Sequence, residues 1–173
     1  GCHDTLGFGE DKRRMIGPGL RNIKNKVGAK WITAWIKDPK GFRPTTLMPD
    51  FRLSEEEAQA IAAYLWQHAD EKGIYEEMPA FDDEQLSQGD FLFEQMGCMA
   101  CHTYEKDAER GFAPNLARIS EKINYGYLVE WIMNPQGKEP LTRMPSFRMS
   151  QERASLVAGY LINKTSKSDA KAG

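Results

Sequence analysis

The stretch Cys98-Met99-Ala100-Cys101-His102 decides how this 173-residue chain is interpreted. Two residues separate the two cysteines, and a histidine follows the second one directly. A C-x-x-C pair alone also occurs as a dithiol redox pair or as half of a zinc site. The redox pair needs a βαβ context and the zinc site needs a second, suitably spaced ligand pair, and we recognise neither in the sequence. The added histidine favours covalent haem attachment, in which the thiols form thioethers and the histidine binds the iron.

The chain also contains an internal repeat. Trp35-Ile36-Lys37-Asp38-Pro39 returns as Trp131-Ile132-Met133-Asn134-Pro135, a shift of 131 − 35 = 96 residues. An ungapped match over several rare residues indicates two copies of one structural unit. The same shift relates further segments, namely Pro18-Gly19-Leu20 with Pro114-Asn115-Leu116, and Met48-Pro49-Asp50-Phe51-Arg52 with Met144-Pro145-Ser146-Phe147-Arg148.

The repeat gives a meaning to the dipeptide Cys2-His3. It pairs with Cys101-His102 at a shift of 101 − 2 = 99 residues, so we interpret it as the end of a second haem-attachment motif. The first cysteine of that motif would fall two residues before Gly1. Two explanations stay open: an upstream segment with its own helix is absent from the given chain, which we favour, or a single thioether of Cys2 holds the first haem.

Apolar residues recur at helical spacing, and no segment alternates convincingly with period two, which predicts an all-α fold. Each copy shows a short helix around its repeated tryptophan, a proline-bearing loop with a methionine, and a final helix. Ser54 and Glu57 form a possible capping box at the start of one final helix. We expect a first domain over 1–72, a linker over 73–82, a second domain over 83–164 and a frayed tail over 165–173.

Each copy resembles a class I, mitochondrial-type cytochrome c domain, and the pair is similar in layout to the tandem dihaem cytochromes of the c4 group. The resemblance implies helices wrapped around a covalently bound haem in each domain. It also implies two haem c groups, each with a histidine and a methionine on the iron and a proline carbonyl that accepts the histidine Nδ1–H. The residues that carry it are Cys98, Cys101, His102, Pro114 and Met144 in the second copy, and Cys2, His3, Pro18 and Met48 in the first.

The repeat selects two methionines from eight. Met48 and Met144 alone occupy equivalent positions, and a proline follows each one. We therefore expect them to be axial ligands opposite His3 and His102. Trp35 and Trp131 are expected to pack against the haem, and an alternative is that their indole N–H groups donate to a haem propionate.

Composition and ligation together point to electron transfer rather than catalysis. A net charge of −2 argues against nucleic acid as the main partner, and no apolar run is long enough for a transmembrane segment. Two six-coordinate irons suit an electron carrier between a respiratory donor and acceptor, with redox proteins as partners. The alternatives are a dihaem enzyme of the cytochrome c peroxidase type, and a redox subunit of a quinol-oxidising or terminal oxidase membrane complex.

Covalent haem attachment implies the periplasm or an equivalent extracytoplasmic space, where a subunit of such a complex would be membrane-associated.

Overall fold

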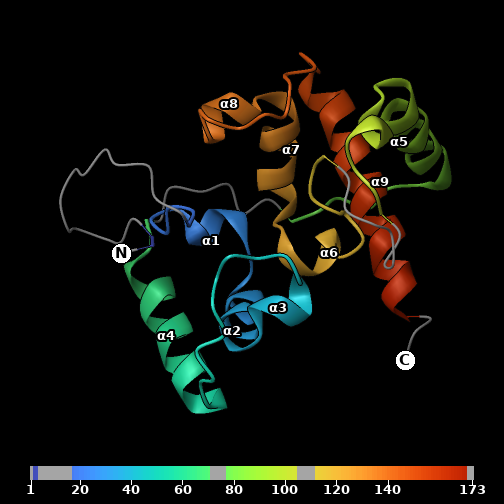
Figure 1. Cartoon of the computed structure of the whole chain (residues 1–173). Coiled ribbons are helices and arrows are strands. Elements are labelled where there is room, and N and C mark those ends of the chain that lie inside the picture. Colours follow the sequence, from blue (N-terminus) through green and yellow to red (C-terminus); the bar gives the residue numbers. More distant parts are fainter. Residues whose placement is uncertain (1, 4–16, 71–76, 105–111, 171–173) are drawn as a thin grey trace. The chain divides into compact units, whose positions relative to one another are not determined.

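The computed structural model describes residues 2–3, 17–70, 77–104 and 112–170, and their regular structure is helical (Figure 1). No β-strand occurs in these ranges, as the all-α expectation requires. The chain divides into two compact units, which we call unit 1 (Gly1–Gly73) and unit 2 (Ile74–Gly173). No helix in the described part of the chain has the length and apolar character needed to cross a membrane.

Unit 1 is built around the pairing of its two longest helices. Helix α2 packs against α4, and the short α1 also contacts α4. The core between them consists of Val27, Ile32, Ile36, Ala58 and Ala62, all buried. The helices of unit 1 are α1 (Ile23–Lys26), α2 (Ala29–Lys37), α3 (Pro39–Phe42) and α4 (Glu55–His68).

Local sequence determines where these helices begin. The Ser54 hydroxyl accepts the Glu57 backbone N–H at 3.2 Å, and the Glu57 carboxylate accepts the Ser54 N–H at 2.8 Å, so the predicted capping box is present. Helix α2 ends at Lys37, two residues before Pro39, and Pro39 opens α3 where the sequence suggested only a loop. A proline at the first helical position loses no hydrogen bond, and the Asp38 carboxylate caps the new turn by accepting the Gly41 N–H.

Unit 2 is organised around its last helix. Helices α5, α6 and α7 all contact α9 (Figure 1). Phe93, Leu128, Ile132, Val157 and Leu161 are among the buried residues of the resulting core. The elements of unit 2 are α5 (Asp83–Gln95), the 3-10 turn η1 (Cys98–Ala100), α6 (Ile119–Lys122), α7 (Tyr125–Met133), α8 (Pro135–Lys138) and α9 (Gln151–Ala170).

Helix α5 crosses α9 at a glycine. A Cβ at Gly89 would lie 2.7 Å from the Tyr160 Cβ and would also overlap the Leu156 carbonyl oxygen. Asp82 and Gln85 cap the start of α5 reciprocally at 2.8 and 3.0 Å. At its other end Gly97, with φ of 69°, turns the chain out of the helix and directly into η1. Helix α5 therefore leads directly into the C-x-x-C-H segment, and η1 contacts this helix.

Two segments that were expected to lie outside the domains are partly described by the structure. The tail was expected to fray from residue 165, but α9 continues to Ala170. Thr165 is buried, and its hydroxyl donates to the Leu161 carbonyl at 2.8 Å, so the helix is packed at this residue. At the end of the expected linker, the Phe81 ring packs edge-on against Tyr125, 6.1 Å between centroids, and so belongs to unit 2. Residues 73–76 and 171–173 lie outside the described ranges.

The loops that carry Met48 and Met144 share an unusual backbone conformation. Arg52 and Arg148, one repeat apart, have φ angles of 54° and 52°. A side chain with a Cβ pays a steric cost in this left-handed region. Both arginines are exposed, so burial of the side chain does not compensate for that cost.

We predict that Gly89→Ala lowers the free energy of unfolding by roughly 1–3 kcal/mol, because the new Cβ meets the backbone of α9, which cannot move aside cheaply. Urea denaturation followed by circular dichroism measures the change. The control is Ser87→Ala, which places alanine at an exposed site of the same helix and is expected to leave the stability within about 0.5 kcal/mol. Equal stability of the two variants would contradict the close crossing.

A second prediction concerns the left-handed arginine. Arg148→Gly is expected to raise the free energy of unfolding by roughly 0.5–1 kcal/mol, because glycine adopts positive φ without a steric penalty. Thermal denaturation of the full chain tests this. Arg143→Gly in the same loop is the control; Arg143 has no positive φ, so glycine there is expected to destabilise. A loss of stability in both variants would argue against strain at Arg148.

Candidate haem sites

Each candidate histidine is tied to a proline carbonyl. The His3 Nδ1 lies 2.8 Å from the Pro18 carbonyl oxygen, and the His102 Nδ1 lies 2.8 Å from that of Pro114. A carbonyl oxygen only accepts, so each Nδ1 must carry the proton and donate it. The Nε2 atom of each ring is then the nitrogen with a lone pair available for a metal.

Backbone hydrogen bonds close the same loops. The Gly17 N–H donates to the Cys2 carbonyl at 2.7 Å, and the Ala113 N–H donates to the Cys101 carbonyl at 3.0 Å. In each unit the residue before the proline is thus fastened to the cysteine before the histidine. The family resemblance implied the hydrogen bond between histidine and proline. The sequence gave no indication of this second, backbone hydrogen bond.

The cysteines of unit 2 sit on the short turn η1. Cys98 packs partly against the core, and burial raises the pKa of its thiol. Cys101 is exposed, one turn further on. The His102 N–H donates to the Cys98 carbonyl at 3.0 Å, so the turn carries both thiols and the histidine as one segment. In unit 1, Cys2 is also exposed and not disulfide-bonded.

The two predicted methionine ligands are held by threonines. The Thr46 hydroxyl accepts the Met48 N–H at 3.2 Å, and the Thr142 hydroxyl accepts the Met144 N–H at 3.3 Å. In unit 2 the Gln136 side-chain amide also donates to the Met144 carbonyl at 2.6 Å. Sequence reasoning missed the threonines, although Thr46 and Thr142 stand 142 − 46 = 96 residues apart and the repeat would have marked them.

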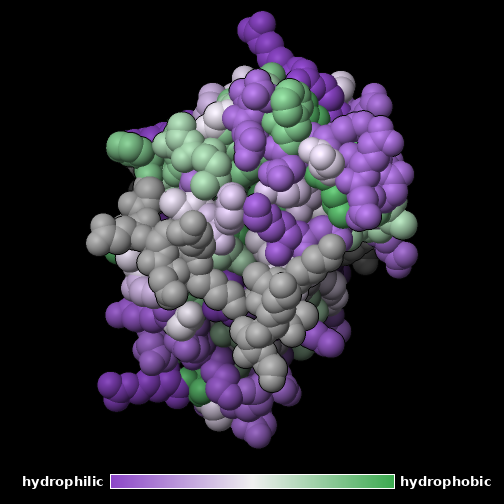
Figure 2. Space-filling model, turned by 90° about the vertical axis from the view of Figure 1, so that its right-hand side faces the viewer, coloured by the Kyte–Doolittle hydropathy of each residue, from purple (hydrophilic) through white to green (hydrophobic). Residues whose placement is uncertain are grey.

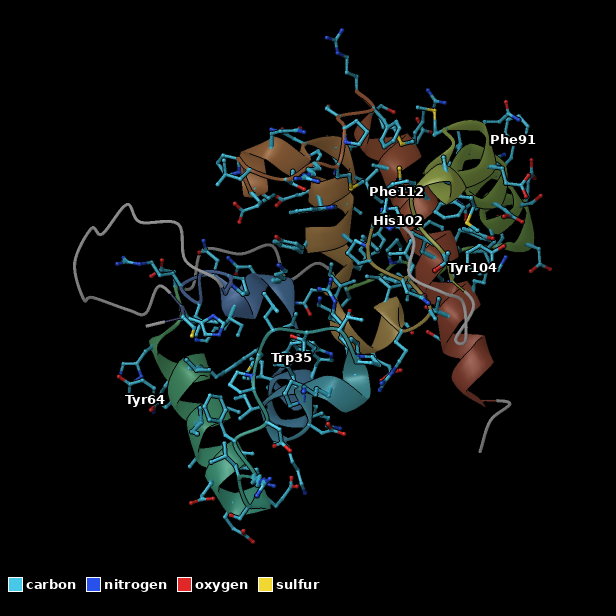
Figure 3. All side chains as sticks on the ribbon, in the orientation of Figure 1. Trp35, Tyr64, Phe91, His102, Tyr104 and Phe112 are labelled. Carbon is cyan, nitrogen blue, oxygen red and sulfur yellow. The ribbon has the colours of Figure 1, made fainter. Side chains whose placement is uncertain are left out.

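The repeated tryptophans point at the methionines. The Trp35 Nε1–H donates to the Met48 sulfur at 2.9 Å, and the Trp131 Nε1–H donates to the Met144 sulfur at 2.9 Å. The sequence left open the alternative that the indole N–H donates to a haem propionate. In both units this N–H instead donates to the methionine sulfur. Trp35 lies on α2 and is labelled in Figure 3.

The surface near the unit 2 motif combines apolar and polar side chains. Phe112, in the loop between His102 and Pro114, is 99% exposed, and Met99 between the cysteines is also exposed. Figure 3 labels Phe112 together with His102 and Tyr104. The face of the molecule in Figure 2 is mostly polar, with smaller hydrophobic patches among the purple side chains. Apolar side chains beside His102 suit a large, mainly apolar cofactor better than a hydrated ion.

The donor set fits a covalently attached haem. It offers thiols for thioether bonds, an imidazole with Nε2 free, and a neutral sulfur, which together are the ligands of a His/Met haem iron. In the described part of the chain, no group of three or more His, Cys, Asp or Glu side chains is gathered as it would be around a metal ion held by protein ligands alone.

Comparisons with known proteins find similarity to cytochrome c. The cytochrome c family model matches residues 1–69. A solved structure of cytochrome c from Rhodothermus marinus is 25% identical over a match that covers 51% of this chain and 83% of that one, with a TM-score of 0.43. No curated protein sequence matches the chain.

Cytochrome c domains bind haem c covalently and typically act as electron carriers. Over residues 1–69 this chain is similar to that family.

Proposed function

We propose that this chain is a dihaem electron-transfer protein in which units 1 and 2 are both cytochrome c domains. The observation that carries the proposal is the repetition of one contact, the 2.8 Å pairing of a histidine Nδ1 with a proline carbonyl. Unit 2 lies beyond the residues that the family model matches. It nevertheless contains the complete C-x-x-C-H motif and the equivalent histidine, proline and methionine.

In unit 1 the haem would be bound through Cys2, His3 and Met48, and in unit 2 through Cys98, Cys101, His102 and Met144. When bound, a haem supplies one-electron chemistry, since its iron changes between the ferric and ferrous states. The chain orients each imidazole through Nδ1 and fixes each methionine backbone through a threonine. A neutral sulfur ligand raises the reduction potential relative to a second histidine.

The proposed ligand set favours a carrier over an enzyme. A histidine and a methionine in each unit would both bind the iron, which would leave no position on it for a peroxide substrate. An electron carrier needs no such position. Its partners are then redox proteins in the periplasm or an equivalent extracytoplasmic space. Two haems would also suit a redox subunit of a respiratory membrane complex, because electrons could enter at one unit and leave at the other.

The number of haems is directly testable. We expect the intact mass of the denatured protein to exceed the mass of the chain by two haems, because thioether bonds survive denaturation. Cys98→Ala combined with Cys101→Ala should remove one of them, and Cys2→Ala should remove or weaken the other. Ser87→Ala on exposed α5 surface serves as the control and should retain both. A wild-type mass with a single haem, unchanged by the double substitution, would contradict a haem in unit 2.

The methionine assignment makes a second prediction. Met144→Ala should lower the reduction potential of the unit 2 haem and open its iron, so that carbon monoxide binds rapidly to the reduced protein. The wild type should bind carbon monoxide slowly at both haems. Met78→Ala, an exposed methionine without a repeat partner, is the matched control and should behave like the wild type. Rapid binding by the wild type would instead favour the peroxidase-type alternative.

A further inference from the structure

A lysine near the end of α9 lies between two tyrosines of unit 2. The Lys164 ammonium group lies 4.1 Å from the centroid of the Tyr104 ring and 5.1 Å from that of Tyr160, and it donates to the Tyr160 hydroxyl at 2.6 Å. The buried Phe93 ring packs against both tyrosine rings, with centroids 6.2 and 5.8 Å apart. The cation is therefore held in a fixed place at the edge of the unit 2 core.

The Tyr160 hydroxyl links this cation to an acid on α5. It accepts a hydrogen bond from Lys164 and also bonds to the Asp90 carboxylate, which only accepts, so the hydroxyl proton points to Asp90. Burial and the bond to Asp90 raise the pKa of Tyr160 to about 12, so the phenol is neutral near pH 7. The pKa of Lys164 is raised as well, because burial lowers it less than the hydrogen bonds to Tyr160 and Tyr104 raise it. A positive and a negative charge thus stand on opposite sides of a neutral hydroxyl.

The positive charge lies beside the segment that carries the proposed iron ligand. Tyr104, which contacts the Lys164 ammonium group, is two residues after His102, and Figure 3 labels both. The Thr103 carbonyl between them accepts the Leu116 N–H at 2.6 Å, which closes the loop in which the proline partner of His102 lies. Lys164 therefore contacts the loop that orients the imidazole.

Unit 1 has a different residue at the equivalent position. Lys164 corresponds to His68, at the repeat shift of 164 − 68 = 96 residues. The exposed His68 ring stacks on Tyr64 at 4.2 Å between centroids, and its Nδ1 lies 2.9 Å from the Tyr64 carbonyl oxygen on the same helix. A cation held between two tyrosines therefore distinguishes unit 2 from unit 1 at this repeat position.

We propose that Lys164 raises the reduction potential of the unit 2 haem and so makes the two haems inequivalent, an inference that rests on the proposed function. Reduction adds one electron to the iron and lowers the net positive charge of the haem. A fixed cation repels the ferric form more than the ferrous form, so it favours reduction. The Asp90 carboxylate acts in the opposite sense. Because Lys164 is half-buried, water screens its charge less than the charges of exposed residues.

Two substitutions that nearly preserve side-chain shape test this role in the full chain with its haems attached. Lys164→Met removes the positive charge and should lower the potential of the unit 2 haem, whereas Asp90→Asn removes the negative charge and should raise it. At an effective dielectric constant of about 20, charges separated by roughly 12–25 Å, the scale of a small domain, change a one-electron equilibrium roughly tenfold to threefold. For a one-electron couple this is a shift of about 59 to 28 mV.

A spectroscopic redox titration measures both potentials, with the unit 1 haem as an internal reference. The transition that disappears when Cys98 and Cys101 are both replaced by alanine belongs to the unit 2 haem. The matched control is Arg153→Met, which removes a positive charge from an exposed position of α9 and should change the same equilibrium less than about twofold. Lys164→Arg keeps the charge and should retain most of the wild-type potential.

The opposite signs of the two shifts separate an electrostatic role from loosened packing. Loosening would admit water to the site in both variants and move the potential in one direction. Unchanged unit 2 potentials in Lys164→Met and Asp90→Asn, or shifts of the same sign, would overturn the proposal. An equally large shift in Arg153→Met would do so too, because any nearby charge would then have the same effect.

The intact mass keeps these outcomes apart from a failure of the proposed function. If the wild type and the variants each carry two haems and the potentials do not respond, the role of Lys164 alone has failed. If unit 2 carries no haem, the proposed function itself has failed.

Discussion

The hydrogen bond between each histidine Nδ1 and a proline carbonyl is the constraint on which the candidate sites depend. An unrestrained imidazole could present either nitrogen and could rotate about its side-chain bonds. The carbonyls of Pro18 and Pro114 remove both freedoms by accepting the proton of Nδ1 at 2.8 Å. Because proline has no N–H and a restricted φ, its carbonyl sits in a stiff segment. The N–H of the residue before each proline donates to the carbonyl of Cys2 or Cys101. This hydrogen bond keeps the proline segment beside the motif.

The two units contain equivalent candidate sites, but the final helix of each unit is covered to a different extent. In unit 2, α5 crosses α9 at Gly89, and Tyr160 is 7% exposed. The equivalent residue on α4 of unit 1 is Tyr64, which is 57% exposed and stacks on His68 instead. The proline, threonine and tryptophan contacts to the histidine and the methionine nevertheless recur in both units. The residues that make them lie on the shorter helices and loops next to each motif.

Much of the helical layout could be predicted because periodicity, proline positions and capping residues act locally. The Ser54–Glu57 capping box and the end of α2 before Pro39 follow from neighbouring residues alone. The extension of α9 through the expected tail did not follow, because the burial of Thr165 depends on the packing of other elements around it. The second role of Pro39, as the first residue of α3, was missed because a proline both stops one helix and starts another.

By itself the sequence determined which residues are candidates to attach a haem and to bind its iron. It supplied the C-x-x-C-H motif and the 96-residue repeat, and the repeat selected Met48 and Met144 from eight methionines. Only the tertiary structure decided how the donors are used. It assigned the indole N–H groups of Trp35 and Trp131 to sulfur, and it brought Thr46 and Thr142 to the methionine backbones. The physical reason is that spacing along a chain identifies candidate donors and acceptors, whereas a hydrogen bond needs a distance and an angle that packing sets.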